Sequence, residues 1–132
     1  MPVDSDRPAH PLAGLRPAAP ADPRWRARLE SRWRARLLEV TELSLAYHDA
    51  AAAPVGSEGQ DAAAAEAGRR QLRRLLSRAV DARRALADTE EALVRLAAGR
   101  FGRCEHCAQP IPATDLALIP EARYCPRCAP AS

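Results

Sequence analysis

The sequence predicts an all-α protein, in which an antiparallel coiled-coil helical hairpin is followed by a small module built around four cysteines. Two long segments show the heptad recurrence of apolar residues that is typical of paired helices. A break rich in Pro and Gly separates these segments, and the four cysteines all follow the second one. The 132 residues include 30 Ala but only 4% aromatic residues, a composition that can line a narrow helix–helix seam but cannot fill a wide globular core.

Residues 1–23 are predicted to form a disordered or extended tail. Six of the twelve prolines lie there. Proline lacks a backbone N–H and restricts the residue before it, so the segment suits neither a helix nor a strand. The tail ends in a helix-start signal, because Asp22 can cap a helix and Pro23 suits its first position. We therefore expect the hairpin to occupy 24–98.

The first helix of the hairpin is predicted from 24 to about 53. Its larger apolar residues recur at spacings of three, four and seven positions, which places them along one seam. They are Leu29, Trp33, Val40, Leu43 and Tyr47, with Leu37 beside them. Pro54, Gly56 and Gly59 then interrupt the pattern. Since such residues break helices, the bend of the hairpin is expected near 54–60.

The second helix is predicted over 61–98. Ser57 and Gln60 fit a capping box at its start, and Gly99 supplies a stop signal at its end. Between them lie four heptads with two seam positions each. These are Leu72, Ala79, Leu86 and Leu93 at one position and Leu75, Ala82, Thr89 and Leu96 at the other. A short connection between two long helices makes them antiparallel neighbours, and the small Ala side chains allow close packing.

The sequence also argues against several classes of protein. It contains no apolar stretch approaching the roughly 18–20 residues of a membrane span, and its first residues are charged and Pro-rich, unlike a signal peptide. We therefore expect a cytoplasmic protein. Histidines and serines are scattered, and no Gly-rich phosphate-binding loop occurs, so we do not expect an enzyme. The net charge of +3 does not by itself identify a nucleic-acid-binding protein.

The four cysteines give the strongest chemical signal. Cys104 and Cys107 form one Cys-x-x-Cys turn, and Cys125 and Cys128 form a second after seventeen intervening residues. In a reducing compartment such paired turns indicate metal ligation rather than disulfides. Four thiolates complete a tetrahedron and leave no position for water. The sequence thus predicts a structural Zn²⁺ in a zinc finger over 99–132.

Several alternatives stay open for this module. The thiols could be unligated, iron could occupy a similar thiolate cage, and His106 could replace one cysteine as a ligand. The arginines around the module either offset the negative charge of a zinc–thiolate unit or lie on an ordinary surface. They are Arg100, Arg103, Arg123 and Arg127.

The residues around the cysteines form a wider pattern. It comprises Gly-Arg-Phe-Gly-Arg-Cys-Glu-His-Cys at 99–107, Pro-Ile-Pro at 110–112, Leu116, Ile-Pro at 119–120, Ala-Arg-Tyr-Cys at 122–125, and Cys128. This pattern resembles the zinc finger of the DksA/TraR family. The resemblance is specific over 93–128, architectural over the hairpin and absent over 1–23. It implies a bacterial transcription regulator that binds RNA polymerase directly rather than promoter DNA.

The resemblance also implies how such a protein would act. Members of the family insert a coiled-coil hairpin into the secondary channel of RNA polymerase, with acidic residues at the tip near the catalytic metal. Their tip motif reads Asp-x-x-Asp-x-Ala. Here the nearest match begins at Glu58 and includes Asp61 and Ala63. Asp61 and Ala63 match the motif and Glu58 departs from it, so these three are the candidate tip residues that the resemblance implies.

The charge distribution independently predicts an acidic bend. No Lys or Arg occurs between Arg36 and Arg69, whereas six carboxylates lie there: Glu39, Glu42, Asp49, Glu58, Asp61 and Glu66. An acidic bend would be repelled by a nucleic-acid backbone but could approach a metal ion or a basic channel. Alternatively, Glu58 and Asp61 only complement the dipole at the start of the second helix.

The Arg-rich stalk supports a different hypothesis. Arginines cluster over 24–36 and 69–84, where they could contact nucleic-acid phosphates or form a solvated face paired with nearby carboxylates. Direct nucleic-acid binding is not our first expectation, because no DNA-reading motif accompanies the charge. The alternative function is a zinc-stabilised adaptor or nucleic-acid-binding protein that uses this stalk. Trp33 is expected in the seam and Trp25 over the zinc module.

Overall fold

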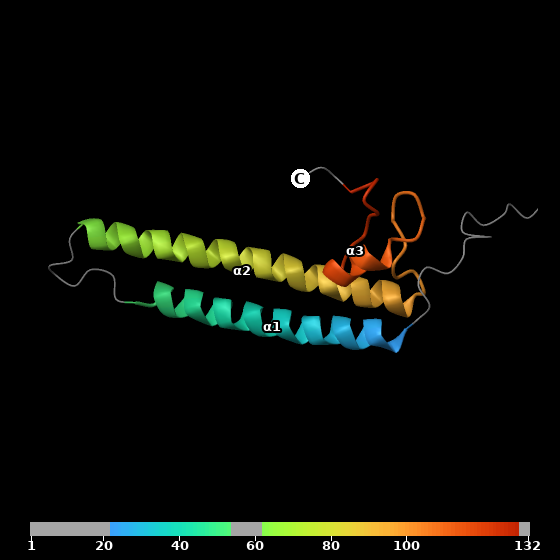
Figure 1. The fold of residues 1–132 in the computed structure, drawn as a ribbon. Coiled ribbons are helices and arrows are strands. Elements are labelled where there is room, and N and C mark those ends of the chain that lie inside the picture. Colours follow the sequence, from blue (N-terminus) through green and yellow to red (C-terminus); the bar gives the residue numbers. More distant parts are fainter. Residues whose placement is uncertain (1–21, 54–61, 130–132) are drawn as a thin grey trace, which may run out of the picture.

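The computed structural model describes residues 22–53 and 62–129. Its helices are α1 (Pro23–Ala51), α2 (Ala62–Ala97) and the short α3 (Ala113–Leu118). α1 and α2 run antiparallel, and the chain after α2 folds into a small module, which includes α3, at the open end of the hairpin (Figure 1). The described residues contain no strand, although Arg103 and Pro110 form an isolated β-bridge. The predicted all-α hairpin is therefore confirmed.

α1 begins as the sequence predicts. The side chain of Asp22 accepts a hydrogen bond from the backbone N–H of Arg24 at 2.9 Å, and Pro23 lies in the first turn. The first N–H groups of a helix have no partner within it, so a carboxylate cap satisfies one of them and proline removes another. The capping box predicted at Ser57 and Gln60 lies outside the described residues.

α2 ends at the glycine that the sequence marks as a stop. The backbone N–H of Gly99 donates to the carbonyl of Leu96 at 3.2 Å, and that of Arg100 donates to the carbonyl of Arg95 at 2.8 Å. These two bonds form a Schellman motif around Gly99, whose φ of +72° is left-handed. A residue with a Cβ adopts this conformation only at a cost, so glycine is suited to turning the chain from α2 toward the cysteines.

The seam face of α2 follows the predicted heptads. Of its eight predicted positions, Ala79, Ala82 and Thr89 are buried and the five leucines are half-buried. Ala79 and Ala82 form a cluster with Leu43 of α1, against which Val40 and Leu75 pack. Because alanine is small, the two helix backbones approach closely at this level of the stalk.

The seam face of α1 agrees with the prediction. Its members are the buried Leu29 and Leu43 and the half-buried Trp33, Val40 and Tyr47. Leu37, which the sequence places beside these residues, is 40% exposed. An alternation of four and three residues from Leu29 and Trp33 brings Arg36, not Leu37, to the next seam position. Leu37 therefore lies at the edge of the seam.

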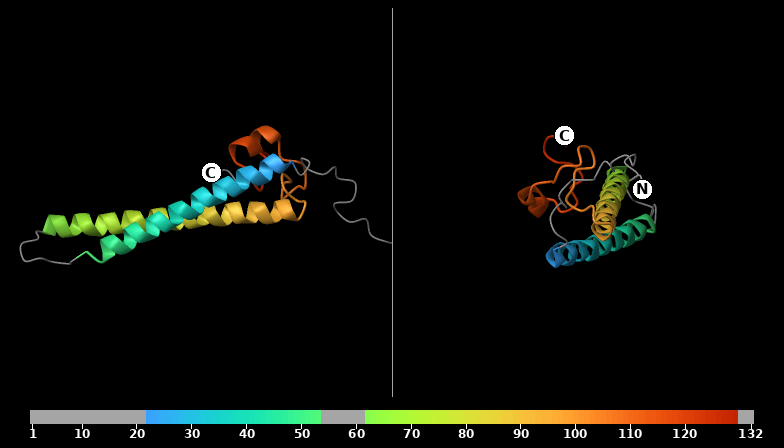
Figure 2. Two further views of the ribbon diagram at one scale, coloured as in Figure 1. Left: turned by 90° about the horizontal axis from the view of Figure 1, so that it is seen from below. Right: turned by 90° about the vertical axis from the view of Figure 1, so that its right-hand side faces the viewer.

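A second buried cluster joins the hairpin to the cysteine module. Leu29 of α1 and Ala92 of α2 are completely buried among Phe101, Ile111 and Leu116 of the module. Ala92 lies beside the predicted seam, so the buried face of α2 is wider than the seam at this end. This face contacts both α1 and the module, which lies to one side of the helix pair (Figure 2).

Trp25 packs against this cluster, as predicted. Its ring centroid lies 5.4 Å from that of Phe101, and the guanidinium of Arg28 lies 5.7 Å from the Trp25 ring. Arg28 also donates to the backbone carbonyl of Ala117 in α3. The start of α1 thus holds the module through an aromatic contact and a hydrogen bond.

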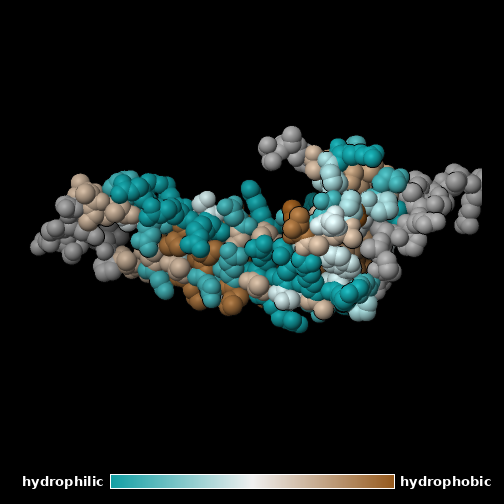
Figure 3. All heavy atoms as spheres, viewed as in Figure 1, coloured by the Kyte–Doolittle hydropathy of each residue, from teal (hydrophilic) through white to brown (hydrophobic). Residues whose placement is uncertain are grey.

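The visible surface is largely hydrophilic, with separate hydrophobic patches on the stalk and beside the module (Figure 3). The most exposed large apolar residues are Leu38, Leu45, Val94, Leu118 and Ile119. Among the described helices, none combines the length and the apolar character that crossing a membrane requires.

Leu43→Ala should lower the free energy of unfolding by about 2–5 kcal/mol, because it removes a buried side chain from the seam. Leu45→Ala is the matched control: Leu45 is 59% exposed on the same helix, and its loss should cost about 0.5 kcal/mol or less. Denaturant unfolding followed by circular dichroism measures both. Equal losses would show that α1 packs through a different face.

Candidate metal centre

The first Cys-x-x-Cys turn is shaped by backbone hydrogen bonds. The N–H of Cys104 donates to the carbonyl of Gln109 at 2.8 Å, and the N–H of Ala108 donates to the carbonyl of Cys104 at 2.9 Å. Ala108 has a φ of 61°, a left-handed conformation that is uncommon for a residue with a Cβ. The chain therefore reverses directly after Cys107.

The second turn repeats part of this pattern. The N–H groups of Cys128 and Ala129 donate to the carbonyl of Cys125 at 3.0 and 2.9 Å. The N–H of Glu105, inside the first turn, donates to the carbonyl of Arg123 at 2.8 Å, just before the second turn. This bond brings together two turns that are far apart in the sequence.

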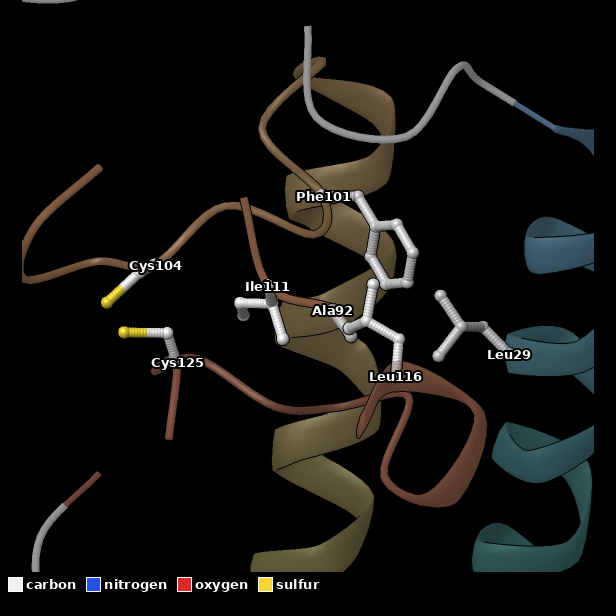
Figure 4. Packing of buried hydrophobic residues seen from close by; sticks show 7 residues of the cluster. All are labelled: Leu29, Ala92, Phe101, Cys104, Ile111, Leu116 and Cys125. Atoms are coloured by element: carbon white, nitrogen blue, oxygen red, sulfur yellow. The ribbon is translucent and has the colours of Figure 1, made fainter. Parts of the chain in front are cut away.

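The four thiols meet in one cluster. All four Sγ atoms lie within 4.8 Å of one another, and those of Cys107 and Cys125 are 3.7 Å apart. A tetrahedral zinc with Zn–S bonds of about 2.3 Å places its sulfur ligands about 3.8 Å apart. Figure 4 shows the sulfurs of Cys104 and Cys125 close together, next to the apolar cluster. The donor set and its spacing therefore fit a structural zinc, and His106 does not belong to the cluster.

The thiols differ in their tendency to ionise. Burial opposes ionisation of Cys104, but the backbone N–H groups of Cys107, Cys125 and His106 favour its thiolate and lower its pKa to about 6. At Cys128, burial and the hydrogen bonds of neighbouring thiols raise the pKa to about 12. The cluster thus accepts one negative charge readily and resists further ones, a resistance that a divalent cation would remove.

Two of the four arginines that flank the cysteines make specific contacts. Arg123 forms ion pairs with Asp88 and Glu91 of α2, so it fastens the module to the helix. Arg103 donates to the carbonyl of Ala108 at 3.0 Å and braces the first turn. The sequence suggested that these arginines either offset the charge of a zinc–thiolate unit or lie on an ordinary surface. Arg123 does neither, because it links the module to α2.

Glu121 links the module to both long helices. Its carboxylate accepts hydrogen bonds from Arg32 of α1 at 2.9 Å and from the Thr89 hydroxyl of α2 at 3.0 Å. Its backbone carbonyl accepts from Arg95 of α2 at 3.2 Å. Sequence reasoning missed this network. The one available signal was Thr89, a polar residue at a heptad seam position, and no pattern marked Glu121 or Arg95.

Three arginines in the first turns of α1 contact other groups of the protein. Arg24 pairs with Asp22, and Arg32 pairs with Glu121. Together with the bond from Arg28 to α3, these contacts occupy three of the side chains that could otherwise bind phosphates. They weaken the nucleic-acid hypothesis for this end of the stalk.

The candidate tip residues fall at the edge of the described chain. Glu58 and Asp61 lie outside the described residues, and Ala63 is exposed in the first turn of α2. The tip assignment therefore stays a prediction.

Two of the carboxylates counted toward the acidic bend have cationic partners. Glu39 lies 3.4 Å from Arg36, and Glu66 lies 2.9 Å from Arg69 and 3.2 Å from Arg73. The excess of negative charge on this half of the hairpin is thus smaller than the sequence suggests.

Comparison with known proteins gives one structural and one partial sequence match. No family model matches the sequence. Transcription factor DksA2 from Pseudomonas aeruginosa superposes with a TM-score of 0.68 at 23% identity, covering 80% of this chain and 77% of that one. The chain has the DksA fold. This agrees with the resemblance to the DksA/TraR family that the cysteine module shows in the sequence.

A shorter similarity links the DksA-like chain to an uncharacterized protein of Aquifex aeolicus (strain VF5). The two are 41% identical over 44 residues, which is 33% of this chain and 30% of the other protein. The match therefore spans less than a third of that relative's length and carries no functional information.

The purified protein should contain one tightly held Zn²⁺, and Cys104→Ser should release it and unfold residues 100–128. The module has few large apolar residues, so metal ligation should supply much of its stability. Elemental analysis and circular dichroism measure the two effects. His106→Ala is the control and should keep the metal, since His106 lies outside the thiol cluster. A wild-type module that stays folded in excess chelator would contradict the prediction.

Glu121→Gln should lower the free energy of unfolding at neutral pH by about 1.5–3 kcal/mol, the usual value of a hydrogen bond to a charged group. Burial raises the pKa of Glu121, but the hydrogen bond from Arg32 and the other donors outweigh it and hold that pKa below its ordinary value. The stabilisation is therefore present above the unfolded-state pKa of about 4.3 and is lost as pH falls through the folded-state pKa.

The control for this substitution is Glu90→Gln, at an exposed position of α2. Unfolding measured over a pH series should show a difference between wild type and Glu121→Gln that shrinks toward low pH, and no such difference for the control. A loss that is the same at every pH would refute the role given to the Glu121 charge.

Proposed function

We propose that the chain is a DksA-like regulator of transcription, which binds RNA polymerase through its hairpin and carries one structural zinc. The observation that supports this proposal is the match of the fold to transcription factor DksA2 over 80% of the chain. The four-thiol cluster at the open end of the hairpin supports the zinc. The chain acts by binding and does not catalyse a reaction of its own.

The shape of the molecule suits this mode of action. α2 has 36 residues, and at 1.5 Å per residue it is about 54 Å long. The module makes one end broad, whereas the described residues at the other end belong to the two helices (Figure 1). In the proposal, the broad end stays outside the polymerase and the bend enters its secondary channel.

The bend would then act through charge. Glu58 and Asp61 would lie near the catalytic metal of the polymerase, and Ala63 would leave space beside them. Carboxylates at that place perturb the metal or its ligands electrostatically. Binding would depend mainly on the stalk and the module, so the charges at the tip would influence activity more than affinity.

A second candidate is a zinc-stabilised adaptor or nucleic-acid-binding protein that uses the stalk. One observation favours it. The side chains of four arginines of α2 form no hydrogen bond or ion pair with the described residues: Arg74, Arg78, Arg83 and Arg84. Binding to phosphates through them would weaken steeply with salt and would not require polymerase.

A binding experiment separates the two candidates. Immobilised wild-type protein should retain purified bacterial core RNA polymerase at physiological salt, and it should bind double-stranded DNA or RNA much more weakly. Retention of nucleic acid with a steep salt dependence, but no retention of polymerase, would favour the second candidate instead.

Asp61→Asn should abolish the effect on transcription while leaving folding and polymerase binding nearly unchanged. The substitution removes the negative charge and keeps the shape of the side chain. Transcription in vitro with the cognate polymerase measures the effect, and Glu58→Gln should weaken it in the same direction. Asp81→Asn, at an exposed position of α2 away from the bend, is the matched control and should be silent. Full activity of both the Asp61 and Glu58 variants would refute the tip assignment.

A further inference from the structure

Arg95, in the last turn of α2, carries a charge that is buried next to the cysteine module. Its side chain is only 7% exposed. Burial lowers the pKa of its guanidinium below the ordinary value, which means that the site disfavours the positive charge. A buried cation is stable only when a negative partner compensates for the water it has lost.

The carboxylate nearest to Arg95 compensates it only in part. Glu105 lies 3.7 Å from the guanidinium and is itself 41% exposed. A charge-assisted hydrogen bond between such groups is about 2.8 Å long, so this pair is a loose one. Glu121 bonds to Arg95 only through its backbone carbonyl, and its carboxylate, which is paired with Arg32, acts on Arg95 more weakly than Glu105 does.

The other charged residues near Arg95 do not supply the missing negative charge. Asp88 acts on Arg95 from a distance and has Arg123 as its own partner. Arg100 acts in the opposite sense, since its positive charge further disfavours that of Arg95. The described carboxylates therefore leave Arg95 short of negative charge.

The thiol cluster is the group that can provide this charge. Arg95 and Cys104 line the same open cavity of about 350 Å³. A zinc ion held by four thiolates has a formal charge of about −2, and attraction across a partly buried site is screened less than in water. Arg95 also contacts residues near both Cys-x-x-Cys turns. Glu105 lies inside the first turn, and Glu121 lies four residues before the second.

We propose that Arg95 is the counter-charge of the metal centre: its buried guanidinium stabilises the anionic zinc–tetrathiolate unit and thereby slows loss of the metal. The inference rests on the zinc site of the proposed function and assigns a positioning and electrostatic role to a residue of the stalk. It also couples the metal to the hairpin, because the same side chain belongs to α2.

The test compares the rate at which full-length, zinc-loaded variants transfer their metal to excess chelator, followed with a coloured zinc indicator. Arg95→Met removes the charge and keeps much of the volume, and Arg95→Lys keeps the charge. We expect Arg95→Met to release zinc about 10- to 100-fold faster, as is typical when a group that supports metal ligands is lost. Arg95→Lys should recover most of the wild-type rate, and Arg84→Met, at an exposed position of α2, should match wild type.

The variant Leu93→Ala tests whether Arg95 acts through its charge or only by holding the module on α2. Leu93 packs against the cluster that joins α2 to the module, so this variant weakens the same junction without changing its charge. At equal loss of thermal stability, Arg95→Met should release zinc faster than Leu93→Ala. Cobalt-substituted samples should keep the tetrahedral thiolate spectrum in both variants.

Two results would overturn the inference: Arg95→Lys as fast as Arg95→Met, or Arg95→Met no faster than Leu93→Ala of matched stability. Failure of the underlying zinc proposal looks different. In that case the wild-type protein itself would bind neither zinc nor cobalt, whatever residue is present at position 95.

Discussion

The burial of Leu29 and Ala92 beneath the cysteine module is the contact on which the rest of the structure depends. Two helices whose seam is rich in alanine bury little apolar surface, so the hairpin gains modest stability from its own packing. The module adds Phe101, Ile111 and Leu116 to that seam at the open end and covers both helices at once. It therefore fixes the distance and angle between the start of α1 and the end of α2. Because helices are stiff, this arrangement also orients the rest of the hairpin.

The polar contacts around this cluster determine its orientation. Apolar contacts have no preferred direction, so by themselves they would allow the module to rotate on the helices. Glu121 prevents this because it bonds to α1 and α2 together, and Arg123 adds ion pairs to the outer face of α2. The base of the molecule is thus held by directional bonds, whereas the stalk beyond Leu43 has no buried cluster among the described residues.

The sequence predicted those features that follow from periodicity, caps and ligand spacing. The start of α1 at Asp22, the end of α2 at Gly99 and the seam of α2 depend on local rules, and the structure agrees with them. The convergence of the four thiols follows from their spacing and is also found. The domain boundaries and the tip residues stay predictions, since Glu58 and Asp61 lie outside the described residues.

The contacts between module and stalk could not be derived in the same way. Arg32 and Glu121 are 89 positions apart, and each resembles an ordinary surface residue in its own segment. A helical pattern reports one periodic face, but the buried face of α2 widens near the module to include Ala92 and Arg95, which the heptads leave outside the seam. Spacing also leaves the burial of Leu37 undetermined, and this residue at the edge of the seam is 40% exposed.

The placement of charge along the molecule connects its stability with its proposed action. Near the base, arginines are bound by carboxylates and carbonyls of other elements, as Arg28, Arg32 and Arg123 show, so their charge serves the fold. Farther along α2, Arg78 and Arg84 have no such partner in the described chain and leave their charge available to a binding partner. In the proposed function, a stalk that is held at its base and basic along the middle of α2 would present that charge to the polymerase in a fixed orientation.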